Sequence, residues 1–312
     1  MAGALGLRTR PGWESLASSG RQVGGRAMGE LSDTGEDGAG GGEAAGVPRL
    51  DFGTADRGTP YARYARLAEL HRLQQPRSTV EAEYAFLVTT QVMELLFDLL
   101  HHEWRLAQRA LRADDLTAAL AALGRGAHVQ DVLTGSWDLL ATLTPAEFGA
   151  FRPALGEASG FQSAAFLRLE FLLGNKNGAL LRMYRDEPAG HAELTAALHA
   201  PSLYDDALAL LDRRGVPVPH AASTGRHRAD PAVVAAWRQV YTEPAHHDLA
   251  RLGEALLDTA ERVTRWRQRH YSAVKRAMGR RPGTGGSSGL DWLRRSAEQD
   301  VFPELWAVRD EL

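Results

Sequence analysis

The chain has 312 residues and no cysteine, with 36 basic and 39 acidic side chains and a formal charge of −3. The lack of cysteine excludes disulfides, iron–sulfur clusters and thiolate catalysis, and the near-neutral charge argues against binding to nucleic acid or a membrane surface, which needs a basic face. No apolar run reaches the ~18 residues of a membrane-spanning helix, and the first residues lack a signal-peptide core. We therefore expect a soluble, cytoplasmic protein with no nucleic-acid or membrane partner.

The N-terminal part of the chain differs in composition from the rest. Residues 1–50 hold 13 of the 32 glycines, and the stretch 29–46 is acidic and almost without large apolar side chains. Such a segment buries too little apolar surface to offset the entropy lost on ordering. The composition predicts a disordered tail over 1–50 and a folded domain over 51–312.

From residue 51 onward, apolar residues recur at i, i+3, i+4 and i+7, the spacing of amphipathic helices. The expected helices cover 61–75, 83–111, 116–143, 163–173, 191–199, 203–213, 230–240, 245–278 and 290–299. Thr144 and Glu147 form a capping box with Pro145 at the first helical position, which predicts a further short helix. Since alternating strand patterns are hard to find, the sequence predicts an all-α fold, a helical bundle.

Three places on these helices are candidates for chemistry. Phe86, Thr90, Met93 and Phe97 lie along one face of the helix 83–111, which by itself is a core stripe. A threonine there can hydrogen-bond to its own helix backbone, so Thr90 is also compatible with a structural role. His270 shares an apolar stripe with Trp266 and Val274 at i−4 and i+4. It is either a core histidine or an axial ligand of a haem iron, a role that imidazole suits.

The third place is the short helix that contains Phe148 and Arg152. An arginine can hold a carboxylate with two parallel hydrogen bonds, or it can be a surface residue. Pro153 predicts that the helix ends at Arg152 and that the Arg152 backbone leaves helical geometry. The loop GTGGSSG, residues 283–289, is either a flexible connector or a site where main-chain N–H groups approach an anion.

Taken together, these segments resemble tryptophan 2,3-dioxygenases. The resemblance runs from about Tyr61 to Leu312 and rests on YARYARLAELHRLQQPRS, FLVTTQVMELLFDLLHHE, EFGAFRPALGEASGFQS, EFLLGNKN, WRQRHYSAVKRAMG and GTGGSSGLDWLR, in family order. It implies an all-α bundle with a haem pocket, haem b with its iron as cofactor, L-tryptophan or a substituted tryptophan and O2 as substrates, and a homotetramer arranged as a dimer of dimers.

The resemblance also implies roles for individual residues. His270 matches the axial ligand of the haem iron, and Gly285 belongs to the loop beside the cofactor. Arg152 matches the arginine that holds the substrate carboxylate. The remaining matches are substrate contacts, of which the two tyrosines reach the active site of a neighbouring subunit: Tyr61, Tyr64, Phe86, Phe148 and Thr284.

One departure from the family pattern is chemically central. The family usually has histidine where Thr90 stands, over the distal face of the haem, and tryptophan where Leu96 stands. The related indoleamine 2,3-dioxygenase has serine at the distal position, so this chemistry does not require the histidine. The change makes ring-substituted or β-substituted tryptophans plausible substrates.

Three functions are therefore in competition. The first is 2,3-dioxygenation with ring opening to an N-formylkynurenine. The second is monooxygenation of tryptophan or β-methyltryptophan to an oxindole in specialised metabolism. The third is a non-enzymatic haem sensor, against which the retained Phe148, Arg152 and Thr284 argue. The number of oxygen atoms in the product distinguishes the first two.

Overall fold

The computed structural model describes residues 58–219, 229–281 and 289–312. The tail expected over 1–50 lies outside these ranges. Residues 61–312 form one compact unit. Within the described ranges, the regular elements are α-helices and 3-10 helices without a β-strand, which confirms the all-α prediction. No helix in these ranges is long and apolar enough to cross a bilayer.

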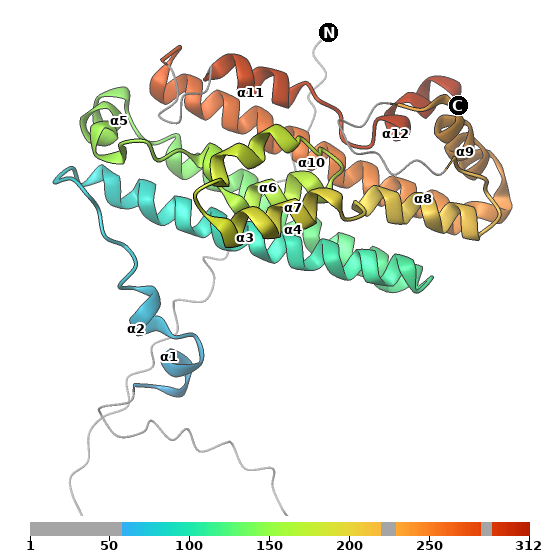
Figure 1. The fold of residues 1–312 in the computed structure, drawn as a ribbon, viewed down its shortest axis with the longest axis horizontal. Coiled ribbons are helices and arrows are strands. Elements are labelled where there is room, and N and C mark those ends of the chain that lie inside the picture. Colours follow the sequence, from blue (N-terminus) through green and yellow to red (C-terminus); the bar gives the residue numbers. More distant parts are fainter. Residues whose placement is uncertain (1–57, 220–228, 282–288) are drawn as a thin grey trace, which may run out of the picture. The chain divides into compact units, whose positions relative to one another are not determined.

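Three long helices dominate this unit: α3 (Ala82–Arg112), α4 (Leu116–Leu140) and α10 (His247–Met278). The helix α4 packs against both α3 and α10 (Figure 1). A tight turn joins α3 to α4, with Asp114 at a φ of 60° and the Asp115 side chain accepting a hydrogen bond from the Ala118 N–H at the start of α4. Gly279, with a φ of 62°, ends α10 where the sequence predicts it.

Shorter helices surround these three. The α-helices are α5 (Pro145–Phe151), α6 (Ala164–Leu172), α7 (Pro188–His199), α8 (Leu203–Arg213), α9 (Pro231–Thr242), α11 (Leu290–Ala297) and α12 (Pro303–Ala307). The 3-10 helices are η2 (Arg152–Leu155), η3 (Gly160–Gln162), η4 (Gly178–Tyr184), η5 (Pro244–His246) and η6 (Val308–Glu311). The capping box predicted at Thr144 is present, because its hydroxyl accepts from the Glu147 N–H while the Glu147 carboxylate accepts from the Thr144 N–H.

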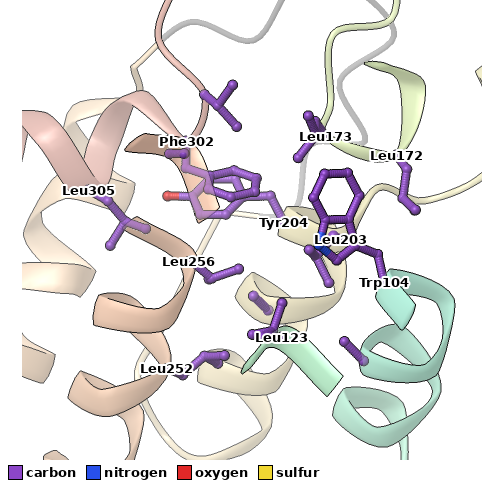
Figure 2. Close-up of a cluster of buried hydrophobic side chains, with 14 of the residues drawn as sticks. Trp104, Leu123, Leu172, Leu173, Leu203, Tyr204, Leu252, Leu256, Phe302 and Leu305 are labelled. Carbon is purple, nitrogen blue, oxygen red and sulfur yellow. The ribbon is translucent and has the colours of Figure 1, made fainter. Parts of the chain in front are cut away.

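The main core lies where α3, α4, α8, α10 and α12 meet (Figure 2). Trp104 of α3 and Leu256 of α10 are almost completely buried there. Tyr204 of α8 stacks on Phe302 with the ring centroids 4.9 Å apart, and the Trp237 Nε1–H donates to its hydroxyl at 2.8 Å. Burial of this apolar surface provides the main driving force that holds the short C-terminal helices on the long ones.

The predicted helix over 61–75 is wrong in its extent. The structure has two short helices instead, α1 (Pro60–Tyr64) and α2 (Leu67–Leu70), which are separated by Arg66 at a φ of 51°. Neither helix contains a buried residue. A helix depends on packing of its apolar face for most of its stability, so an unpacked segment does not sustain a long one. The chain that follows is attached to α3, where the Gln91 side chain donates to the Leu73 carbonyl at 3.0 Å.

Candidate haem and substrate site

His270 lies near the C-terminal end of α10, within a group of aromatic rings. Its imidazole is stacked on the indole of Trp137 from α4, with centroids 4.3 Å apart and planes inclined by 13°. Trp266, one turn earlier on α10, lies 5.3 Å from the imidazole. Trp266 in turn contacts Phe97 of α3 at 5.9 Å and Phe166 of α6 at 5.2 Å. Four helices thus contribute rings to the surroundings of one imidazole.

The environment of His270 keeps its imidazole neutral. Although solvent reaches part of the side chain, enough protein surrounds it that burial lowers the pKa of His270 to about 4. No hydrogen bond joins either ring nitrogen to another residue in the described part of the chain. A neutral imidazole with a free nitrogen is the form in which histidine binds a metal ion. The arrangement therefore suits the role of an iron ligand.

A second aromatic group lies at the N-terminal end of α3. The ring of Phe86 lies 6.0 Å from that of Phe148 and 5.3 Å from that of Phe151 on α5. Phe148 and Phe151 meet edge to face at 5.2 Å. Phe151 is fully buried, and the sequence analysis did not include it. Its spacing of three residues from Phe148, which puts both on one helix face, is the signal that could have found it.

Thr90 lies one turn beyond Phe86 on α3 and is partly buried. Its hydroxyl donates to the Phe86 carbonyl oxygen at 2.9 Å, the bond to its own helix that threonine commonly forms. Because the hydroxyl proton is engaged in this bond, only the oxygen lone pairs are available to a ligand. A threonine in this state is a weak acceptor and not a base.

Arg152 corrects one expectation and confirms another. The helix α5 does end at Phe151, immediately before Arg152 and Pro153. Arg152 itself, however, has helical angles, with φ −48° and ψ −39°, and its N–H still donates to the Phe148 carbonyl. The reason is that the chain continues into the 3-10 helix η2, where Pro153 occupies one of the first positions and needs no N–H donor. Arg152 thus stays in line with Phe148, and its side chain is partly buried.

Four of the predicted site residues are not found beside His270 or beside the Phe86, Phe148 and Phe151 rings in the structure of one chain. Tyr61 and Tyr64 on α1 are 70% and 92% exposed, and neither has a ring contact with Phe86, Phe148 or His270. Thr284 and Gly285 lie outside the described residues.

A cavity of about 50 Å³ lies elsewhere, between α6 and α11. Phe161, Glu170, Trp292 and Gln299 are among its lining residues, whereas Thr90, Arg152 and His270 are not. Phe166 takes part in both regions, because it lines the cavity and contacts Trp266. The cavity is therefore a neighbour of the His270 surroundings and not the predicted substrate site.

The described residues form an all-helical fold, and among them the neutral imidazole of His270 lies between aromatic rings without a hydrogen-bond partner. A protein of this class is suited to holding a metal-containing cofactor. Comparison with known families identifies the family within this class. The family model described as tryptophan 2,3-dioxygenase matches residues 44–213 and 223–312, and the chain belongs to the tryptophan 2,3-dioxygenase family.

Individual relatives agree with the family model. The chain is 42% identical over 269 residues to a tryptophan 2,3-dioxygenase of Burkholderia pseudomallei (strain 668), which covers 85% of this chain and 87% of the relative. It is 42% identical over 270 residues to a tryptophan 2,3-dioxygenase of Polaromonas sp., covering 85% and 90% of the two chains. A tryptophan 2,3-dioxygenase 1 of Ralstonia nicotianae is 39% identical over 270 residues with the same coverage.

Proposed function

We propose that this protein is a haem-dependent dioxygenase that opens the indole ring of L-tryptophan with O2 and forms N-formylkynurenine. The observation that carries the proposal is the imidazole of His270, which lies among aromatic rings and has no hydrogen-bond partner in the described part of the chain, in a chain of this family. The names of the relatives denote dioxygenases, which favours two-atom insertion over the single-oxygen alternative.

His270 is the residue that would hold the haem iron. Trp137 covers one face of the His270 ring, and this stack restricts rotation of the imidazole. The chain has no cysteine for the thioether links of a covalently attached haem, and the family resemblance implies haem b. When bound, the haem supplies the activation of O2, and the protein supplies orientation and exclusion of water.

The chain offers separate groups for the two ends of the substrate. We assign the rings of Phe86 and Phe148 to the wall against the indole, with the buried ring of Phe151 packed behind them, since aromatic rings contact one another favourably at these distances. Arg152 follows directly on this wall, and its guanidinium has the geometry to hold a carboxylate with two hydrogen bonds. The family resemblance implies that Thr284 would contact the amino-acid end of the substrate and that Gly285 would lie beside the cofactor.

The proposed reaction needs no base at the Thr90 position. Both oxygen atoms enter the substrate, and the bond between indole C2 and C3 is replaced by two C=O groups, so the balance requires neither an external reductant nor net loss of a proton. The Thr90 hydroxyl already donates to the Phe86 carbonyl and has little capacity to take up the indole proton. Its expected role is to give space and a weak acceptor above the indole.

We further propose that the active form is a homotetramer. Tyr61 and Tyr64 leave large aromatic surfaces exposed in one chain. On α3, Val92, Leu95 and Leu99 are also exposed, at 40%, 58% and 45%. Clustered exposed apolar residues of this kind are typical of an interface. A second copy of this chain would cover them, and the tyrosines would then reach its substrate site.

The test is a single-turnover reaction of haem-loaded, reduced protein with L-tryptophan and isotopically labelled O2. We expect a product that carries two labelled oxygen atoms and has lost the indole absorbance. A product with a single labelled atom would establish monooxygenation instead. A reduced, haem-loaded protein that binds L-tryptophan but leaves it unchanged would contradict an oxygenase function altogether.

A further inference from the structure

A buried ion pair lies next to the His270 surroundings and has no role in the function proposed above. Arg267 of α10 donates from Nη2 to both carboxylate oxygens of Glu170 on α6, at 2.8 and 2.9 Å. The two side chains are only 2% and 8% exposed. In the described part of the chain, every other ion pair has at least one partner that is more than one fifth exposed.

The same arginine also binds a third helix. Its Nη1 donates to the carbonyl oxygens of Ser296 at 3.2 Å and Gln299 at 3.1 Å, at the C-terminal end of α11. Glu170 also accepts a hydrogen bond from the Asn175 side chain, whose oxygen accepts from the Gln299 Nε2 at 3.1 Å. One connected network therefore joins α6, α10, α11 and the turn after α6.

Stability alone does not account for this network. The removal of two charges from water costs about as much as their attraction returns, so a buried pair is often no better than apolar side chains of the same size. Moreover, the Arg267 Nε is buried without a hydrogen-bond partner among the described residues, which is itself unfavourable. What a directional pair does provide is a fixed register between the elements that it joins.

The register in question is that of the helix that carries His270. Arg267 precedes His270 by three residues on α10, a rise of about 4.5 Å. Around His270, the contacts of α10 with Trp137 and Phe166 are between rings. The Arg269–Asp138 ion pair beside them also joins α10 to α4, but it is partly exposed, and water weakens such a pair. Apolar attraction between rings is non-directional and allows small slides and rotations. The hydrogen bonds of Arg267 are directional and disallow them.

We propose that Arg267 and Glu170 are positioning residues, which hold α10 in the register in which His270 presents its imidazole to the haem iron. This inference rests on the proposed function, because it takes His270 as the iron ligand. Outer partners that orient a metal ligand typically contribute 10- to 100-fold in affinity. We expect an effect of about that size on haem retention, with little effect on the stability of the haem-free protein.

The main test replaces both charges together. The double variant Arg267→Met/Glu170→Met avoids an unpaired buried charge, so the haem-free protein should unfold at the same urea concentration as wild type or a higher one. Its haem should nevertheless transfer to apomyoglobin about 10- to 100-fold faster. The ferrous iron–histidine stretching band should also broaden or shift. Wild-type haem transfer together with a wild-type band would overturn the proposal.

A matched control comes from the same helix. Arg262 also joins α10 to another helix, through Asp131 of α4 at 3.2 Å, but this pair is partly exposed. Arg262→Met should leave haem transfer and the iron–histidine band unchanged. If Arg262→Met accelerates haem loss as much as the double variant does, the effect is a general loosening of α10, and the specific role of Arg267 is refuted.

Two further variants cover the case in which the double variant does not fold. Glu170→Gln keeps a hydrogen-bond acceptor, and the cavity of about 50 Å³ that Glu170 lines has room for waters beside the substituted side chain, since each needs roughly 10–15 Å³. Arg267→Lys keeps the charge but cannot reach Glu170 and both carbonyls at once. Each should show faster haem transfer than wild type, and wild-type rates in both would overturn the proposal.

The same series separates this inference from the proposed function. Haem transfer and the iron–histidine band are measured without tryptophan, so they do not depend on the reaction. If wild-type protein binds haem through His270 but the variants behave like wild type, the positioning role alone is wrong. If wild-type protein shows no iron–histidine band, both the proposed function and the positioning role are overturned.

Discussion

The imidazole of His270 and the indole of Trp137 lie face to face, 4.3 Å apart and inclined by 13°. The two rings come from α10 and α4, helices that pack along each other. Rotation of the imidazole would break this stack, so Trp137 restricts the directions in which the ring nitrogens of His270 can point. A residue without any ligating atom thereby contributes to the geometry of the candidate iron site.

Substitution of Trp137 should separate the stacking role from general packing. Trp137 is 8% exposed, and replacement of a buried tryptophan by alanine costs about 3–5 kcal/mol of unfolding free energy. Trp137→Phe keeps an aromatic face for the imidazole and should lose much less. We expect urea unfolding and the haem absorbance to place Trp137→Phe near wild type and Trp137→Ala far below it. Equal behaviour of the two variants would show that the stack does not matter.

If His270 holds the haem iron, its replacement should prevent stable haem binding. No cysteine in the chain can replace it as a ligand, so His270→Ala should have no stable haem, or haem with an altered Soret band and no turnover. His128→Ala, at an exposed position on α4, is the control and should retain the wild-type spectrum. An unaltered Soret band with normal turnover in purified His270→Ala would disprove the assignment.

The sequence predicts the helices well because their signal is local. Predicted boundaries for α3, α4 and α6–α11 lie within about three residues of the observed ones, since apolar spacing, capping residues and glycines act over a few positions. The α1–α2 region is the exception. The apolar spacing of this region is helical, but neither α1 nor α2 contains a buried residue, so tertiary packing does not stabilise a long helix. Arg66 adopts a left-handed conformation that the local sequence does not indicate.

The site is only partly predictable, for the opposite reason. The apolar stripe that contains His270 is visible in the sequence, whereas its stacking partner Trp137 lies more than a hundred positions away and becomes visible only in the fold. Arg267 belongs to the polar segment WRQRH, whose sequence gives no sign that one of its two arginines is buried. Its burial against Glu170, 97 positions away, is a property of tertiary packing. The roles of Thr284 and Gly285 remain predictions.

The hydrogen bonds that join Arg77 and Ser78 to Glu83 of α3 should weaken in acid. Glu83 is 4% exposed, and the hydrogen bond from the Arg77 N–H, followed by those from Ser78, lowers the pKa of Glu83 below its ordinary value of 4.5. The charged form is therefore favoured in the folded state. Its contribution to stability is complete above pH 4.5 and is lost as the pH falls through the lowered pKa.

Glu83→Gln tests this dependence. The variant should be less stable than wild type at neutral pH by roughly 1–3 kcal/mol, because charge-assisted bonds to Glu83 are lost. The difference should shrink in acid, where the wild-type carboxyl is also neutral. Urea unfolding followed from neutral to acid pH measures this, and Glu81→Gln, at an exposed neighbouring position, is the control. A difference that does not change with pH would rule out the carboxylate as its cause.

The exposed tyrosines should act on the substrate site of another subunit. Tyr61 and Tyr64 are 70% and 92% exposed in one chain, and an aromatic contact contributes about 0.5–1.5 kcal/mol. Each alanine substitution should therefore raise KM about 2- to 10-fold without changing haem content, while Tyr→Phe changes should have less effect. Light scattering at assay concentration should give a tetramer. A fully active monomer would refute the proposed assembly.

Arg152 gives the sharpest test of how the substrate is held. If its guanidinium binds the carboxylate, Arg152→Ala removes a charge-assisted hydrogen bond of roughly 1.5–3 kcal/mol, which corresponds to a loss of about 10- to 150-fold in kcat/KM. Haem content should be unchanged, because Arg152 follows the Phe148 and Phe151 rings on α5 and not the rings around His270. Arg182→Ala, at an exposed position, should have no effect.

Tryptamine, which lacks the carboxylate, shows whether the loss is specific. Wild-type protein should prefer tryptophan strongly, and Arg152→Ala should nearly abolish this preference, because the mutation removes an interaction that tryptamine never makes. The helical backbone of Arg152 keeps it in line with Phe148, so the carboxylate and the indole would be held by adjacent turns of one continuous helical segment. If the variant still prefers tryptophan by the wild-type ratio, the carboxylate is bound by another group, and Thr284 becomes the leading candidate.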